Sequence, residues 1–139
     1  MRKIALGVAS LLLASCASTA EVRSVESWSG RIAAEEFDDL RAAASVNSGM
    51  YETAASVSIA GASANATIPW HVHVGRCGSG GAIVGNAAAY SPISVGSNGE
   101  GRASARVNVA LASGGQYHVN FHQSPSNLGT IIGCLNLSR

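Results

Sequence analysis

The sequence predicts a single all-β domain of the sandwich or barrel type. Two segments, TAASVSIAG at 53–61 and RASARVNVAL at 102–111, alternate between apolar and polar residues with a period of two, as strands with one buried face do. Clusters of Gly, Ser and Asn separate these and other short apolar runs and mark turns. No segment has a convincing helical pattern, and 139 residues suffice for one domain but not for two.

The N-terminus has the features of an export signal rather than of a folded element. Arg2 and Lys3 precede the run IALGVASLLLAS at 4–15, which is too short for a dedicated membrane span. The run leads into LASC at 13–16, which resembles the bacterial lipoprotein processing signal. The resemblance implies cleavage before Cys16 and acylation of its thiol and new amine. The alternative is an ordinary signal peptide with a chance cysteine.

This resemblance implies three segments: a signal peptide at 1–15, a small, polar tether at 16–27 and the domain at 28–139. The expected partner is a lipid bilayer, reached through acylated Cys16. Ala17 follows the cysteine where inner-membrane lipoproteins carry an acidic retention residue. We therefore expect a lipid-anchored protein of the bacterial cell envelope, on the outer membrane and facing the periplasm.

The charge balance argues against a nucleic-acid partner. Arg2 and Lys3 belong to the signal, so seven of the nine basic residues remain, beside eight acidic ones. This nearly neutral chain has no basic stripe. The sequence identifies no protein partner.

Small residues dominate the predicted strands. In the segment 53–61, Ala55, Val57 and Ile59 share the apolar face, and in 102–111 the apolar face runs from Ala103 to Leu111. The segment 30–45 fits a short helix, or a strand, a turn at EEFDD and a second strand; we favour the second interpretation. A core of Ala and Val has to pack closely.

All four histidines fall in WHVHV at 70–74 and YHVNFH at 117–122. Alternation places His71, His73, His118 and His122 on the faces opposite the apolar residues, so we expect an outward-facing cluster at the surface. Two imidazoles of a His-X-His pair lie within roughly 7 Å, which suits chelation of one copper or zinc ion. The alternative is a set of solvated surface histidines.

The two cysteines left after acylation of Cys16 are Cys77 and Cys134. An exported protein with two free cysteines most simply pairs them. They are 57 positions apart, and a bridge closing such a loop contributes on the order of 4 kcal/mol by the chain-entropy estimate.

The stretches WHVHVGRCGSGGAIVG and YHVNFHQSPSNLGTIIGCLNL resemble the copper-zinc superoxide dismutase family. The resemblance implies a Greek-key β-sandwich or barrel of the superoxide dismutase-like type. It matches His71 and His73 to the first two copper ligands and His122 to the last. It also matches Cys77 and Cys134 to the family's intrasubunit disulfide.

The same stretches resemble the CHRD domain of chordin and of many bacterial secreted proteins. That pattern has a His-X-His, a glycine-rich turn and a strand Tyr-X-X-Asn-X-His before a last strand that contains glycine. Tyr117, Asn120, His122 and Gly133 fit it. This resemblance implies a non-catalytic binding or structural module, in which the histidines and Asn120 hold loops together by hydrogen bonds.

Several positions depart from the dismutase pattern. Residues 78–116 contain neither histidine nor aspartate, so a family-type zinc site is not expected. Tyr90 lies near the place of the bridging histidine, and Ile131 occupies the place of the guiding arginine, for which Arg76 is a candidate substitute. His118 is a candidate fourth ligand, although four residues span about 13 Å along an extended strand, so that a bulge or bend would be needed.

The leading expectation is therefore an envelope lipoprotein that binds copper through His71, His73 and His122. If the protein is an enzyme, the resemblance implies a copper-only dismutase-like oxidoreductase with weak superoxide turnover.

Overall fold

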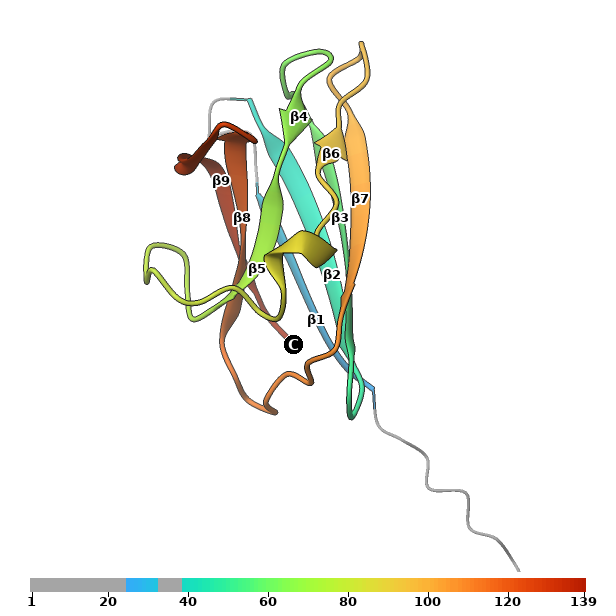
Figure 1. Cartoon of the computed structure of the whole chain (residues 1–139), viewed down its shortest axis with the longest axis vertical. Helices are drawn as coiled ribbons and strands as arrows, with labels where there is room; N and C mark the ends of the chain where they lie inside the picture. Colours follow the sequence, from blue (N-terminus) through green and yellow to red (C-terminus); the bar gives the residue numbers. More distant parts are fainter. Residues whose placement is uncertain (1–24, 33–38) are drawn as a thin grey trace, which may run out of the picture.

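The computed structural model describes residues 25–32 and 39–139, and within this part the chain is an all-β sandwich (Figure 1). The predicted fold class is thereby confirmed. Two antiparallel sheets face each other, and the one helical element, η1 (Ala87–Ala89), is a single 3-10 turn. No helix among the described residues is long and apolar enough to cross a membrane. The predicted signal peptide at 1–15 lies outside the described residues.

The first sheet has four strands in the order β1-β2-β3-β7. Their bounds are β1 (Glu26–Ile32), β2 (Arg41–Ser48), β3 (Thr53–Ala60) and β7 (Gly101–Val107). Strands β1 and β2 confirm the strand interpretation of the segment 30–45, and most of its predicted turn lies outside the described residues. Strand β1 begins two residues before the expected domain boundary at 28, because Trp28 is buried in the core and its strand pairs with β2 from Glu26 onward.

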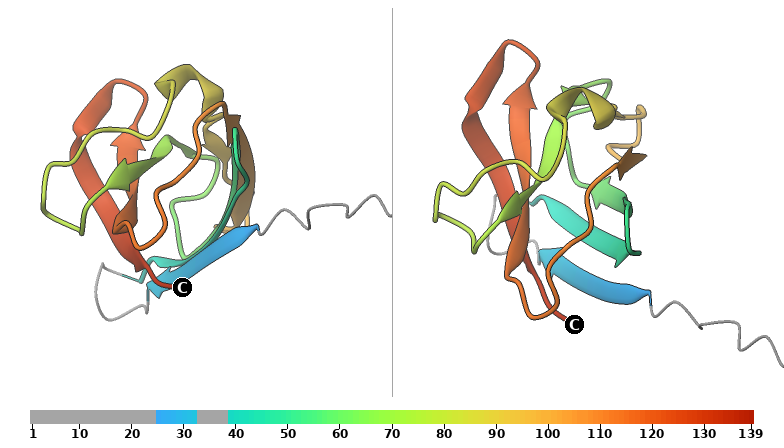
Figure 2. Two further views of the ribbon diagram at one scale, coloured as in Figure 1. Left: turned by 90° about the horizontal axis from the view of Figure 1, so that it is seen from below. Right: turned by 60° about the horizontal axis from the view of Figure 1, so that its bottom comes forward.

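The second sheet has the order β5-β8-β9 and carries all four histidines on two of its strands. Its strands are β5 (Trp70–Val74), β8 (Tyr117–Ser124) and β9 (Asn127–Leu137). A short ribbon of β4 (Thr67–Ile68) and β6 (Ile93–Ser94) lies at one end of the sandwich. Figure 2 shows the two sheets enclosing the interior, with the segment between β5 and η1 standing off the second sheet.

A pair of backbone hydrogen bonds joins the two sheets at one edge. Ser29 in β1 and Ser138, just after β9, each donate an amide to the other's carbonyl, at 2.8 Å in both directions. Strand β9 is therefore held by β8 on one side and by β1 on the other, and the final strand closes this edge of the sandwich.

The core lies between the sheets and consists of the inward residues of each strand. The predicted apolar faces hold in β3, where Ala55, Val57 and Ile59 are all buried. In the segment 102–111 the strand ends at Val107, and Val109 is 39% exposed. The alternation of apolar and polar residues in the sequence therefore continues beyond the end of the strand. The pairing of β7 with β3 ends where Thr53 pairs with Val107, and beyond this point the chain leaves the sheet.

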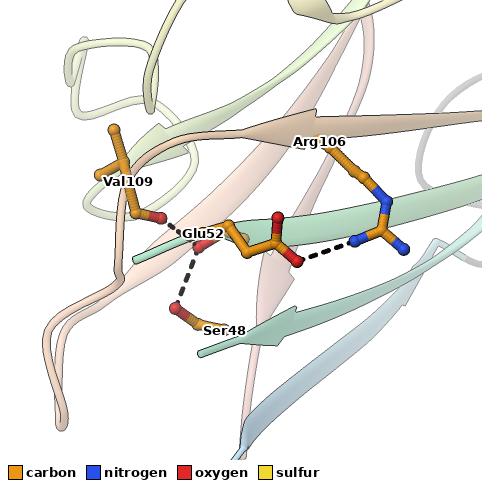
Figure 3. Close-up of polar contacts among 5 residues, drawn as sticks. Ser48, Glu52, Arg106 and Val109 are labelled. Carbon is orange, nitrogen blue, oxygen red and sulfur yellow. Dashed lines mark hydrogen bonds and ion pairs between the residues drawn. The ribbon is translucent and has the colours of Figure 1, made fainter. Parts of the chain in front are cut away.

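A buried threonine ties the segment after β7 to the hairpin of β2 and β3 (Figure 3). The Thr53 hydroxyl donates to the Val109 carbonyl at 2.6 Å and lies 3.0 Å from the Ser48 hydroxyl, which accepts the amide of Leu111 at 2.8 Å. An exposed ion pair, Glu52 with Arg106 at 2.9 Å, lies beside this network. These bonds fix the path of the segment that enters β8.

Replacing Thr53 with valine tests this network. The change keeps the volume of the side chain and removes the hydroxyl, so the free energy of unfolding should fall by about 1–2 kcal/mol. Urea unfolding of the disulfide-bonded protein measures it. Thr67→Val, at an exposed position of β4, is the control and should stay within about 0.5 kcal/mol of the wild type. Equal effects of the two changes would show that the Thr53 hydroxyl stabilises nothing.

Candidate metal centre

The histidines lie on the face of the second sheet that points away from the core, as the alternation predicts. Their neighbours on the opposite face, such as Trp70, Val72 and Val119, are fully buried. The expectation that the cluster lies at the surface is wrong: His118 is 1% exposed and His122 is 6% exposed. The alternation fixes the face of the sheet, but it does not show whether another segment covers that face.

Two segments cover the histidines, and both provide backbone carbonyls. The segment between β5 and η1 places the Gly75 and Gly81 carbonyls against His118 and His73, and the β8–β9 hairpin places the Leu128 carbonyl against His122. These carbonyls could not have been assigned from the sequence. The one available signal is the abundance of glycine and serine after each histidine pair.

Three of the four histidines converge on one point. One ring nitrogen from each of His71, His73 and His122 lies within 4.8 Å of the others. The closest pair is Nδ1 of His71 and Nε2 of His122, 3.1 Å apart. His71 pairs with Asn120 in the regular register of β5 and β8, so His122 is its diagonal neighbour on the same face, within reach of a long side chain. The register shift between Phe121 and His122 belongs to the pair β8–β9, where β9 holds the extra residue, Ile132.

Hydrogen bonds fix the tautomers of two of these rings. A carbonyl oxygen only accepts, so Nδ1 of His73 donates to Gly81 at 2.8 Å and Nδ1 of His122 donates to Leu128 at 2.7 Å. In each neutral ring the lone pair is then on Nε2, which faces the other histidines. Nε2 of His73 is buried and has no hydrogen-bond partner among the described residues. An orphaned buried acceptor of this kind suits a metal ligand.

The donor set fits a small divalent or monovalent ion of borderline softness. With bonds of 2.0–2.1 Å, two imidazole ligands of one ion lie about 3 Å apart, close to the 3.1 Å between His71 and His122. Ring N–H groups donated to backbone carbonyls are the usual outer contacts of metal-binding histidines. The group contains no carboxylate, and three imidazoles suit copper, zinc, iron or nickel.

His118, the candidate fourth ligand, lies outside this group of three. Strand register pairs it with His73, and the two rings stack with centroids 5.1 Å apart and planes tilted by 16°. Its Nδ1 lies 3.0 Å from the Gly75 carbonyl. His118 thus supports the His73 ring from the neighbouring strand.

Burial favours the uncharged form of His71, His118 and His122. It lowers the pKa of His71 to about 4, with smaller contributions from charge on His122 and then His73. Burial also lowers the pKa of His118 and of His122, against the opposing effect of their hydrogen bonds to backbone carbonyls. At neutral pH these rings are therefore uncharged, and an incoming metal ion meets no imidazolium. In the metal-free protein Nδ1 of His71 donates to Nε2 of His122, so the His71 proton has to move to Nε2 of its own ring before Nδ1 can bind an ion.

Tyr90 packs beside the cluster, near the place where the resemblance would put a bridging histidine. Its ring meets those of Trp70 and His71 edge to face, with centroids 5.1 and 5.4 Å apart. Its hydroxyl donates to the Val84 carbonyl at 2.8 Å, and burial raises its pKa to about 12. Tyr90 therefore closes one side of the cluster as a neutral, hydrogen-bonded side chain.

The predicted bond between Cys77 and Cys134 is present, with Cα atoms 5.9 Å apart. It attaches the segment after β5 to strand β9, and the Cys77 amide also donates to the Asn136 side chain at 2.9 Å. The segment also packs closely against the end of β5 at Gly81, where a Cβ would collide with the Val74 carbonyl. Only glycine allows this close approach. The segment that orients His73 is thus fixed at both Cys77 and Gly81.

The position of the expected guiding arginine lies directly across from the cluster. Ile131 pairs with His122 in the register of β8 and β9 and is 44% exposed. Arg76, the candidate substitute, is exposed on the covering segment. The immediate neighbour of His122 on β9 is therefore apolar.

No protein-family model matches the chain, and neither a curated protein nor a solved structure matches it.

Acid should destabilise the metal-free protein through His71. Its pKa is about 4 in the folded state and 6.5 ordinarily, so the unfolded chain binds the proton first as the pH falls. The stability that follows from a neutral His71 is complete above pH 6.5 and is lost as the pH falls through about 4. Chemical unfolding of the chelator-treated protein over this range measures the loss.

His71→Asn is the comparison for this measurement, because it removes the titrating ring and keeps a polar side chain. The variant should lose less stability between pH 6.5 and 4 than the wild type does. Parallel curves for the two proteins would show that His71 is not the group responsible.

Proposed function

We propose that this protein is an envelope-anchored lipoprotein whose superoxide dismutase-like domain binds copper. The observation that carries the proposal is the convergence of His71, His73 and His122, with Nε2 of His73 buried and unpartnered. The anchor rests on the LASC signal and acylated Cys16. The Greek-key, dismutase-like type of the sandwich and the place on the outer membrane, facing the periplasm, belong to the same proposal.

Copper is favoured over zinc by what surrounds the three ligands. The segment that follows the His-X-His strand has no histidine or aspartate between residues 78 and 116, so the family's zinc ligands have no counterparts. Imidazoles bind copper well, and the affinity of a nitrogen site is highest for copper among the first-row divalent metals. Copper supplies one-electron chemistry by changing between two oxidation states. The chain itself holds His73 and His122 in place through the Gly81 and Leu128 carbonyls, and it shields His71 and His122 from bulk water.

Superoxide turnover is the secondary part of the proposal, and we expect it to be weak. Superoxide is an anion, and its capture is faster where a positive charge steers it. Ile131 offers no such charge beside His122, and Arg76 is the one basic residue on the covering segment between β5 and η1. The covering segments also leave His71 only 8% exposed, which restricts access.

A non-catalytic CHRD-like module is the second candidate, and one observation favours it. His73, His118 and His122 each lie within hydrogen-bond distance of a backbone carbonyl of a covering segment. Rings in this arrangement hold loops to the sheet without any metal. Asn120 is buried between them in β8, where the CHRD pattern has an asparagine, but its Oδ1 has no hydrogen-bond partner among the described residues and so holds no loop.

Asparagine substitutions separate the two candidates, because the amide nitrogen of asparagine lies close to the position of histidine Nδ1. His73→Asn and His122→Asn therefore keep a donor for Gly81 and Leu128 and remove Nε2. We expect the wild type to bind one copper ion per chain, with nitrogen couplings in its electron paramagnetic spectrum, and each variant to bind at least 10-fold more weakly, roughly the cost of disturbing one ligand contact.

His118→Asn is the matched control, since it keeps a donor for Gly75 and lies outside the group of three; it should retain the copper ion. Thermal unfolding of all three variants checks that they fold. Folded variants that bind copper like the wild type, or a wild type without a tight site, would leave the CHRD-like module as the function. A superoxide assay on the copper-loaded wild type then measures turnover.

A further inference from the structure

Four large apolar side chains are exposed together at one end of the sandwich. They are Val25, Met50, Tyr51 and Val109, with exposed fractions of 60%, 57%, 71% and 39%. The described residues have three other exposed side chains of this kind, Val74, Leu128 and Ile131, all on the second sheet or its hairpin. We call the first four the terminal patch.

Strand register brings the terminal patch together. Glu26, next to Val25, pairs with Ser48 at the end of β2, and the turn between β2 and β3 carries Met50 and Tyr51. Val109 joins them through the hydrogen bond from Thr53 to its carbonyl. Figure 1 shows the start of β1 and the β2–β3 turn at the same end of the molecule, opposite the turn between β6 and β7.

The charged side chains described at this end are paired with each other. Glu52 contacts Arg106 at 2.9 Å, and Glu26 contacts Arg139 at 3.2 Å. The terminal patch is therefore bordered by neutralised charges and offers no excess of either sign to a charged partner. An amphipathic surface with an exposed tyrosine and no unpaired charge suits the boundary between lipid head groups and acyl chains.

The preceding chain brings this end close to a membrane. Cys16 and Val25 are nine positions apart, and the uncharged run IALGVASLLLAS lies directly before Cys16. Nine residues span at most about 30 Å when fully extended, so anchoring at Cys16 restricts the terminal patch to that distance from the bilayer. The opposite end of the sandwich has no such restriction.

We propose that the terminal patch rests on the lipid surface and is the second contact of this protein with its membrane. The inference rests on the anchoring at Cys16 proposed above. Lipid attached at one residue leaves the orientation of a domain free, whereas a second contact fixes it. Val25, Met50 and Tyr51 then lie at the head-group boundary, and the β6–β7 turn points away from the membrane.

Tryptophan quenching by brominated acyl chains tests this orientation. The full chain is expressed with its leader in a bacterial host, purified from membranes and reconstituted in vesicles of phosphatidylethanolamine and phosphatidylglycerol. Tyr51→Trp reports on the terminal patch, and Ser97→Trp, in the exposed turn before β7, is the matched control. The emission of Trp28 and Trp70, measured in the unsubstituted protein, is subtracted.

We expect brominated lipid to reduce the added emission of the Tyr51→Trp protein roughly twofold, as for a ring at the acyl-chain boundary, and to leave the Ser97→Trp emission unchanged. Equal quenching at both positions, or none at Tyr51→Trp in vesicle-bound protein, would overturn the inference. Flotation and the intact mass of the protein check the anchor separately: a chain that does not float and carries no lipid on Cys16 overturns both the anchor and the contact.

Discussion

Strand β8 is buried on both faces from Tyr117 to His122, and the organisation of the candidate site depends on this constraint. One face packs into the core between the sheets. The other carries polar rings, and a buried polar group is stable only when it is hydrogen-bonded or bound to an ion. The covering segments satisfy this requirement with backbone carbonyls for His73, His118 and His122. Ring nitrogens of His73 and His122 then converge with one of His71. The same arrangement therefore explains both the packing of the loops and the opportunity for a metal.

The sequence predicted those features that depend on local periodicity. Alternation identified the strands and the outward face of His71 and His73, because strand geometry repeats every two residues. It could not predict that another segment covers them, since the segment between β5 and η1 is irregular and half of its residues are glycine or serine. The approach of His122 to His71 depends on the pairing of β5 with β8, in which His71 faces Asn120, and nothing in the periodicity of the sequence indicated that these two strands are neighbours. Resemblance, rather than periodicity, singled out His122.

A metal centre and a loop-holding network make different demands on the same rings. For loop attachment one ring nitrogen suffices, and Nδ1 of His73 and of His122 already serves it. Nε2, the second nitrogen of each ring, is then the atom that distinguishes a metal centre from a loop-holding network. Nε2 of His73 has no partner among the described residues. In the metal-free protein, a hydrogen bond joins Nδ1 of His71 to Nε2 of His122 and gives both nitrogens a partner. The orphaned nitrogen, like the unpartnered Oδ1 of Asn120 beside it, is thus left unexplained by loop attachment.

The hydrogen bonds between Ser29 and Ser138 have a consequence for biogenesis. They join positions 109 residues apart, and the second cysteine of the disulfide also lies in the last strand. A chain that crosses a membrane from its N-terminus delivers β1 early and β9 last. If the proposed signal directs export, the sandwich edge, the disulfide and the fixed covering segment form only after translocation of almost the whole domain. The proposed export would then confine assembly of the histidine cluster to the compartment where the chain arrives.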